Sequence, residues 1–252
     1  MPEKRLAGRA LLSAIGFLTR LPVRRPASLP ASEFAAAAVL FPLVGAALGG
    51  MIGATALALA QVLPALLAAT LAVALELILT GALHVDGLAD GADGLAGRNP
   101  EHSLEIMRDH SLGANGASAL SLDLLAKAVA LGALAESGVV LPVVAAFAVS
   151  RAAPLPLAAA LPYARSGSGT GRSLADRLGL RGAGAGVALA TLIAVGATGA
   201  WAFGTLACLA LVSGAVGGLA RQRLHGVTGD VMGAAIELTA TLGLILAAGW
   251  QA

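Results

Sequence analysis

The sequence has 252 residues, of which 58% are hydrophobic and only 12% are charged, and its mean hydropathy is +0.86. Soluble domains of this length carry about a quarter charged residues, so this composition leaves too little polar surface for a shell that faces water and predicts an integral membrane protein. The net charge of +2 comes with 3% aromatic residues and no Lys/Arg tract, which excludes nucleic acid as a partner. The single cysteine, Cys208, excludes disulfide frameworks and cysteine-type zinc sites.

The first 33 residues are expected to form a cytoplasmic or interfacial segment of a single integral membrane domain, residues 1–252. Residues 10–18 are apolar, with Arg9 before them and Arg20 after them. We interpret this stretch as an amphipathic helix at the membrane surface. A secretory signal peptide that is removed is the alternative.

Apolar runs long enough to cross a bilayer, about 20 residues each, recur along the rest of the chain. They predict an all-α fold, a polytopic membrane helix bundle with about seven transmembrane helices, or between six and eight. The expected spans are residues 34–60, 62–83, 117–135, 138–162, the uncharged stretch 182–220 divided into two near 199–204, and 231–250. Small residues such as Gly45 and Gly49 let helix backbones approach closely, which predicts a tightly packed bundle.

The positions of lysine and arginine indicate which side each connection faces. If the N-terminus lies inside, the inner segments contain nearly all basic residues, whereas the outer turns near residues 61, 136–138 and 199–204 contain none. This asymmetry follows the positive-inside rule. It predicts that an Asp-rich catalytic loop at 84–116 and a basic, Gly-rich loop at 163–182 both face the cytoplasm.

Three aspartates follow the second expected span. Asp86, Asp90 and Asp93 stand at positions i, i+4 and i+7, so on a helix their carboxylates fall on one narrow face. Like charges this close repel one another and favour a shared cation, and hard oxygen ligands suit Mg²⁺. A solvated acidic loop with turn-forming Asp-Gly pairs is the alternative.

A more specific pattern surrounds these aspartates. It comprises Thr80-Gly81, His84, Asp86-Gly87-Leu88-Ala89-Asp90, Asp93-Gly94, Glu105-Ile106-Met107-Arg108-Asp109 and Leu112-Gly113. Further matches, in order along the chain, are 17–22, 41–45, Ser150-Arg151, 163–165 with Gly167 and Gly169, Thr228-Gly229-Asp230, 233–235 and Glu237. In these residues the chain resembles the cobalamin synthase family, the adenosylcobinamide-GDP ribazoletransferases, over nearly its full length. Glu76 is not a motif position and is given no role.

The resemblance implies a Mg²⁺-dependent transferase in the bacterial inner membrane. Its substrates would be adenosylcobinamide-GDP and α-ribazole or α-ribazole 5′-phosphate, and its products adenosylcobalamin or its 5′-phosphate and GMP, in the last assembly step of cobalamin biosynthesis. Asp86, Asp90 and Asp93 would hold the Mg²⁺, with Asp86 and Asp90 also counted as catalytic. The lipid bilayer, a second copy of the chain and other cobalamin-pathway enzymes are the expected further partners. Two alternatives stay open, a CDP-alcohol-type phosphotransferase and a cation-coupled membrane transporter.

The general base has two candidates. On a continuous helix His84 would point away from the carboxylates, but a helix break at Gly87 would let it reach the site as a base for the ribose hydroxyl. A hydrogen-bonded interfacial histidine is the alternative for His84. Asp109 is the competing base or an additional metal ligand. Arg108 beside it is expected to pair with a phosphate oxygen, unless it is only a cytoplasmic anchor.

Charged residues also fall inside the expected spans. Arg151 lies in an apolar span before several prolines, and an arginine at membrane depth needs an acid or a polar cavity, so we expect a phosphate or carboxylate partner. Glu237 needs a partner for the same reason, either Arg151 or the metal site, and a structural ion pair is the alternative. Asp123 and Lys127 stand four residues apart and predict a structural ion pair.

The remaining expected substrate-binding residues lie near the basic loop and the last span. Arg165, Gly167 and Gly169 belong to a Gly-rich stretch that could cradle the guanylyl phosphates, although no P-loop sequence follows and a flexible basic linker is the alternative. Asp230 stands seven residues before Glu237, which places the two carboxylates on one helical face.

Overall fold

The computed structural model of the chain describes residues 2–23, 30–109, 111–166 and 170–251. The helices are α1 (Pro2–Leu18), α2 (Ala31–Ala38), α3 (Phe41–Leu59), α4 (Ala65–Thr80), α5 (Leu83–Gly94), α6 (Pro100–Ile106), α7 (Ala114–Glu136), α8 (Leu141–Ala152), α9 (Pro154–Ala160), α10 (Thr170–Arg177), α11 (Gly179–Thr198), the 3₁₀ helix η1 (Gly199–Trp201), α12 (Ala202–Leu224) and α13 (Gly229–Gln251). These ranges contain no strand and one isolated β-bridge, between Tyr163 and Val227. The all-α prediction is confirmed.

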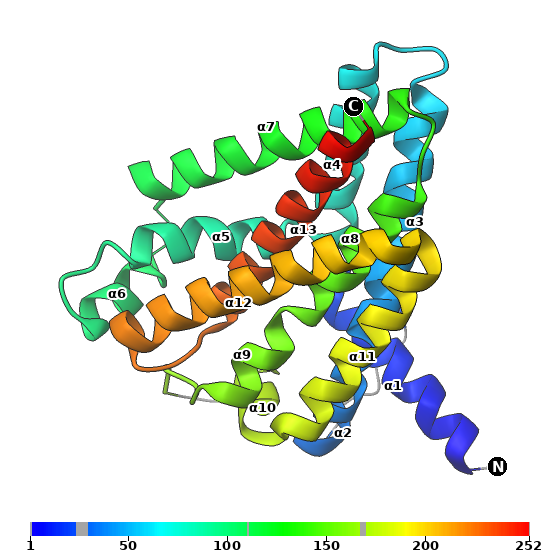
Figure 1. Ribbon diagram of the computed structural model, residues 1–252. Coiled ribbons are helices and arrows are strands. Elements are labelled where there is room, and N and C mark those ends of the chain that lie inside the picture. Colours follow the sequence, from blue (N-terminus) through cyan, green and yellow to red (C-terminus); the bar gives the residue numbers. More distant parts are fainter. Residues whose placement is uncertain (1, 24–29, 110, 167–169, 252) are drawn as a thin grey trace.

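The number of spans differs from the expectation. Five helical stretches are long and apolar enough to cross a membrane, Phe41–Leu59, Ala114–Glu136, Leu141–Ala160, Gly179–Leu224 and Gly229–Gln251, and the bent pair α4 and α5 would make a sixth. Seven spans are therefore not confirmed. The longest stretch is interrupted by η1, at the break expected near 199–204, and the chain turns there from α11 into α12 (Figure 1). The protein is a polytopic membrane helix bundle.

The N-terminal helices pack against the start of the bundle. The first expected span, 34–60, is divided into α2 and α3 at a turn around residues 39–40. Three phenylalanines join the parts. The Phe17 ring on α1 lies 5.1 Å from the Phe34 ring on α2, edge-on, and 5.4 Å from the Phe41 ring on α3, on which it stacks at 10°. This aromatic contact fixes the C-terminal end of α1 beside the bundle.

Helices α3 and α8 approach closely because glycines line their interface. A Cβ atom placed on Gly49 would lie 2.6 Å from the carbonyl oxygen of Val143, and one on Gly45 would collide with the carbonyl group of Phe147. Only glycine leaves room for backbones at this separation. The tight packing predicted from the small residues of this span is confirmed.

Between α4 and α5 the chain bends by 90°. Gly81 and Ala82 both adopt left-handed backbone angles, with φ of 64° and 57°. The loop after α1 supports the bend, since the backbone amide of Arg20 in that loop donates a hydrogen bond to the carbonyl oxygen of Leu79 at 2.7 Å. Helix α5 is continuous through Gly87, so the break at Gly87 that would have let His84 reach the carboxylates does not occur.

Helix α5 lies against α7 and α13, while α3 and α4 stand across them (Figure 1). At the contact with α13, a Cβ atom on Gly87 would lie 2.9 Å from the carbonyl oxygen of Asp230, and one on Gly233 would lie 3.3 Å from that of His84. These two glycines allow the helices to touch. The first turn of α13 is thereby placed beside the aspartates of α5.

Candidate active site

The acidic face of α5 is the centre of the candidate site. Most of the segment 84–116, which we expected as a loop, is helical, and Asp86, Asp90 and Asp93 all lie on α5. Asp86 is exposed, and Asp90 is half-buried. In the described part of the chain neither of these two carboxylates accepts a hydrogen bond from a side chain. Both are open to a ligand.

Asp93 differs from its two neighbours. Its Oδ2 accepts a hydrogen bond from the backbone amide of Gly113, and its Oδ1 accepts one from that of Gly116, both at 2.8 Å. These amides lie at the start of α7, where the first backbone N–H groups of a helix lack partners inside the helix. Asp93 thus caps α7, and among the described residues no group of three His, Cys, Asp or Glu side chains is arranged to hold a metal ion.

Asp230 joins the acidic face from the first turn of α13. Arg165 forms an ion pair with its Oδ2 and donates a further hydrogen bond to the carbonyl oxygen of Met107 at 3.2 Å. The backbone of Arg165 is itself held by Arg172, whose guanidinium donates to its carbonyl oxygen at 2.6 Å. Arg165 therefore ties three segments together beside the aspartates of α5.

The crowding of carboxylates changes the titration of Asp90, which lies on α5 and outside the five stretches that could span the membrane by themselves. Burial, together with the neighbouring Asp86 and Asp230, raises the pKa of Asp90 to about 6, while Arg165 opposes the rise. Such a group favours a nearby positive charge.

A polar cavity of about 470 Å³ opens beside this face. We call it the polar cavity, and its ionisable lining residues are Asp86, Asp90, Arg108, Asp109 and Arg165. Arg108 and Asp109 are both exposed, and Asp109 accepts a hydrogen bond from the Ser111 hydroxyl at 3.0 Å. The structure thus brings Arg108, Asp109 and Arg165 together with two of the three aspartates, as their proposed roles require.

A second cavity, of about 230 Å³, lies on the other side of Asp86. We call it the apolar cavity. Its ionisable lining residues are His84, Asp86 and Asp230, and the remainder of its wall includes Phe17, Tyr163, Leu174 and Ile236. Asp86 lines both cavities.

Deeper in the bundle a second set of charges is completely buried. We call Glu76, Asp123, Lys127, Arg151 and Glu237 the buried ion network. Lys127 Nζ lies 3.2 Å from Glu76 Oε2 and 3.8 Å from Asp123 Oδ2 and forms a shorter ion pair with Glu237, while Arg151 Nη2 lies 3.3 Å from Glu76 Oε1. The network links α4, α7, α8 and α13.

The buried ion network confirms two expectations and decides between the alternatives of a third. Arg151 has the carboxylate partner that we predicted, and Lys127 pairs with Asp123. Glu237 pairs with Lys127, which is the structural ion pair given as the alternative, and not with Arg151 or a metal site. Glu76 is the residue that sequence reasoning missed, although an acidic side chain within an apolar span was itself a signal.

His84 faces the network instead of the aspartates. It is 3% exposed, and its Nδ1 lies 4.0 Å from Glu237 Oε1. Neither ring nitrogen has a hydrogen-bond partner among the described residues, so our alternative of a hydrogen-bonded interfacial histidine is not supported. His84 still reaches the edge of the apolar cavity. Gly167 and Gly169 lie outside the described residues.

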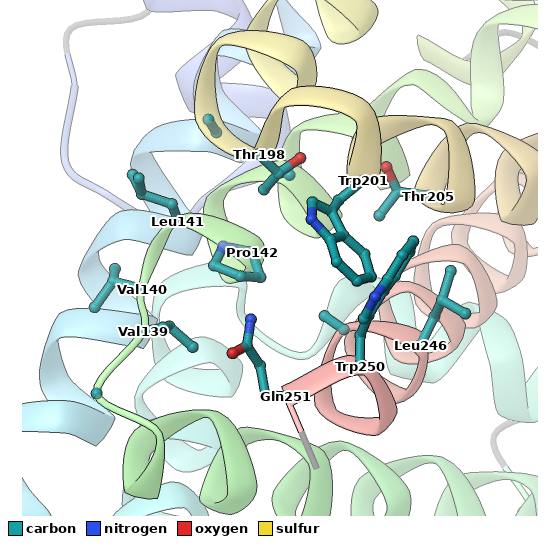
Figure 2. A pocket seen from close by; sticks show the side chains of 14 residues that line it. Val139, Val140, Leu141, Pro142, Thr198, Trp201, Thr205, Leu246, Trp250 and Gln251 are labelled. Carbon is teal, nitrogen blue, oxygen red and sulfur yellow. The ribbon is translucent and has the colours of Figure 1, made fainter.

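Another cavity, of about 350 Å³, lies at the opposite end of α13 from Asp230. Pro142, Trp201, Leu246 and Trp250 are among the residues around it (Figure 2). None of its lining residues is charged. Its described lining therefore offers no acid, base or carboxylate ligand.

The fold and these cavities define a multi-pass membrane protein with a site lined by carboxylates and arginines at one end of its helix bundle. Comparison with known families goes further, because the family described as Cobalamin-5-phosphate synthase matches residues 10–248. The chain belongs to this family.

Similar proteins agree with the family match. The adenosylcobinamide-GDP ribazoletransferase of Syntrophobacter fumaroxidans is 40% identical over 247 residues, covering 94% of this chain and 96% of that protein. The protein of the same name from Chlorobaculum parvum is 37% identical over 248 residues, 95% of each chain. The one from Leptothrix cholodnii is 40% identical over 249 residues, covering 93% of this chain and 94% of that protein. No solved structure matches the chain.

Proposed function

We propose that the chain catalyses the reaction after which these relatives are named, the transfer of an adenosylcobinamide phosphate group from adenosylcobinamide-GDP to α-ribazole or its 5′-phosphate. The family match along residues 10–248 carries this proposal. It is supported by the polar cavity, where Asp86 and Asp90 face Arg108 and Arg165. A cavity with both carboxylates and guanidinium groups suits a substrate that carries phosphates and a cation.

In this reaction a ribose hydroxyl forms a bond to the phosphorus that carries the cobinamide side chain. The bond from that phosphorus to the oxygen that bridges to the second phosphate breaks, and GMP leaves with that oxygen. The hydroxyl proton passes to a base. Such a transfer needs positioning and neutralisation of charge more than covalent participation of the protein. Arg108 and Arg165 would each bind phosphate oxygens.

The carboxylates of the site fit Mg²⁺ in part. Mg²⁺ is commonly held by one or two carboxylates together with substrate phosphates. Asp86 and Asp90 meet this requirement, whereas Asp93 does not, because both of its oxygens already accept backbone hydrogen bonds. We therefore propose that Asp86 and Asp90 hold the ion, and that Asp93 fixes α7 beside them. The bound ion would neutralise charge on the diphosphate.

For the proton of the hydroxyl one candidate is His84, which lines the same cavity as Asp86, although its ring faces the buried ion network. Asp109, in the polar cavity, is the competing base. If His84 is the base, His84→Gln should lower kcat by about 10²–10⁴-fold, as is usual for loss of a general base, while Asp109→Asn changes it far less. The opposite pattern would assign the proton to Asp109.

We also propose that the site faces the cytoplasm from the bacterial inner membrane. The end of the bundle that carries the acidic face also carries Arg98, Arg108, Arg165 and Arg172, while the cavity at the opposite end has no charged lining residue. This asymmetry follows the positive-inside rule. Association with a second copy of the chain or with other cobalamin-pathway enzymes stays a prediction.

Family membership favours this transferase over the CDP-alcohol-type phosphotransferase and the cation-coupled transporter. A transporter should place charges at membrane depth on several helices, and the buried ion network does so. However, its carboxylates and cations are paired with one another, because Lys127 Nζ and Arg151 Nη2 each lie within 3.8 Å of a carboxylate oxygen. Paired charges of this kind stabilise a bundle without forming an ion path.

The test is turnover by the purified protein in detergent, given adenosylcobinamide-GDP, α-ribazole and Mg²⁺, with GMP and cobalamin followed by chromatography. We expect both products from the wild type and neither after EDTA treatment, with recovery when Mg²⁺ is restored. Folded wild-type protein that forms no cobalamin would contradict the proposal.

A further inference from the structure

The two cavities beside α5 meet at Asp86, yet their walls differ in chemistry. Besides Asp86, the polar cavity is lined by two carboxylates, Asp90 and Asp109, and by two guanidinium groups, Arg108 and Arg165. These groups suit a diphosphate with its cation. The volume of about 470 Å³ lies within the range of about 300–1,000 Å³ that is usual for pockets that bind whole small molecules.

The apolar cavity suits a different ligand. Its volume of about 230 Å³ is below that range and is closer to the size of one ring system with a sugar than to that of a corrinoid. Tyr163, the single tyrosine of the chain, and Phe17 present aromatic rings, and Leu174 and Ile236 add aliphatic wall. Aromatic and aliphatic walls favour a flat heteroaromatic base.

The aromatic walls of the apolar cavity are held in place. The Phe17 ring stacks on Phe41 at 5.4 Å, and the guanidinium of Arg172 lies 5.5 Å from the centre of the Tyr163 ring. Tyr163 is also anchored by its backbone, through the β-bridge to Val227. Rigid rings bind a flat ligand with little loss of conformational freedom.

The imidazole and the two carboxylates of the apolar cavity come from two helices that pack together. His84 and Asp86 belong to α5, and Asp230 belongs to the turn of α13 that packs against Gly87. A nucleoside whose base lies among the apolar walls would therefore direct its sugar hydroxyls toward Asp86. The other cavity begins at the same residue.

We infer that the apolar cavity binds the acceptor nucleoside, with its base against Tyr163 and Phe17, and that the polar cavity binds the diphosphate of the donor. The hydroxyl and the phosphorus then meet at Asp86. This inference rests on the proposed function and assigns each substrate to one cavity, which makes Tyr163 a residue that selects the acceptor.

The test separates the Michaelis constants of the two substrates, each varied while the other is saturating. Stacking of a base on an aromatic side chain contributes enough that Tyr163→Ala should raise KM for α-ribazole about tenfold, which corresponds to roughly 1.4 kcal/mol. KM for adenosylcobinamide-GDP should stay within about twofold of the wild type. Tyr163→Phe, which keeps the ring, should restore the wild-type value.

Two further variants complete the design. Arg108→Ala should raise KM for the donor and leave that for α-ribazole unchanged. Phe203→Ala is the matched aromatic control, because Phe203 on α12 is 68% exposed and lines neither cavity, and it should change neither constant. If Tyr163→Ala does not remain folded in size-exclusion chromatography, Phe17→Leu removes the other ring and should give the same selective rise.

The outcomes distinguish this inference from the function on which it rests. Wild-type protein without turnover contradicts the proposed function. If the wild type turns over but Tyr163→Ala raises KM for the donor, or raises both Michaelis constants equally, the assignment of the cavities is overturned. The proposed function then stays intact. Equilibrium dialysis of labelled α-ribazole against each variant checks the same assignment without turnover, and equal binding by wild type and Tyr163→Ala would also overturn it.

Discussion

The buried ion network and the acidic face of α5 contain the same kinds of side chain but differ in how their charges are compensated. In the network, Lys127 and Arg151 stand between the three carboxylates at distances of at most 3.8 Å, and solvent is excluded. On α5, Asp86 is exposed and Asp90 half-buried. Of the two arginines that line the same cavity, Arg165 is already paired with Asp230, and Arg108 forms no ion pair among the described residues. Paired charges hold helices together, whereas uncompensated charges that border a cavity attract a cation or a substrate.

The largest expected effect concerns the network. Lys127→Met removes the cation that Glu76, Asp123 and Glu237 share, and it leaves Asp123 and Glu237 buried without a cation, while Glu76 keeps Arg151. Breaking a buried pair in this way costs about 3–5 kcal/mol. Thermal or denaturant unfolding in detergent should show this loss of stability. Lys127→Arg, which keeps the charge, is the control and should lose less, and an unchanged unfolding transition for Lys127→Met would show that the network has no structural role.

The next largest effect concerns the acidic face. Asp90→Asn keeps the shape of the side chain and removes its charge, so turnover should fall by about 10²–10³-fold, the usual cost of losing one group that stabilises a developing charge. Because Asp90 has no ion-pair partner in the described part of the chain, the unfolding transition should stay in place. Turnover of the variant at the wild-type rate would remove Asp90 from the site.

A smaller effect is expected at Asp93, which lies on the same helix face but caps α7. Asp93→Ala should destabilise the protein by about 0.5–2 kcal/mol, as loss of a helix cap does. The affinity for Mg²⁺, measured from the dependence of turnover on its concentration, should change little. A rise in the Mg²⁺ requirement as large as that of Asp90→Asn would instead make Asp93 a metal ligand.

Sequence reasoning predicted the features that depend on local spacing. The apolar runs predicted α7 and α13 within a few residues, and the i, i+4, i+7 spacing placed three aspartates on one face of α5. The sequence left open whether the helix breaks at Gly87, and the structure bends at Gly81–Ala82 instead. Gly87 and Gly81 look alike in a sequence, and only packing against α13 shows that Gly87 is there to make room.

Features that depend on distant contacts could not be predicted. Asp93 meets amides that follow it by 20 and 23 residues, so its role as a cap depends on where α7 begins. Lys127 is 51 residues from Glu76 and 110 from Glu237. Spacing along the chain cannot show whether Glu237 pairs with Lys127 or with Arg151. What the sequence did show was that each buried charge needs a partner.

The measurement that tests the contrast between the two regions most directly is a paired one, turnover and unfolding temperature on the same preparations of Asp86→Asn and Glu76→Gln. Asp86→Asn should lose turnover and keep the wild-type unfolding temperature. Glu76→Gln, which removes the carboxylate charge shared by Lys127 and Arg151, should unfold at a lower temperature, while the protein that is folded keeps most of its turnover. The reverse pattern, with Asp86→Asn unstable but active and Glu76→Gln stable but inactive, would contradict the assignment of chemistry to α5 and of structural support to the network.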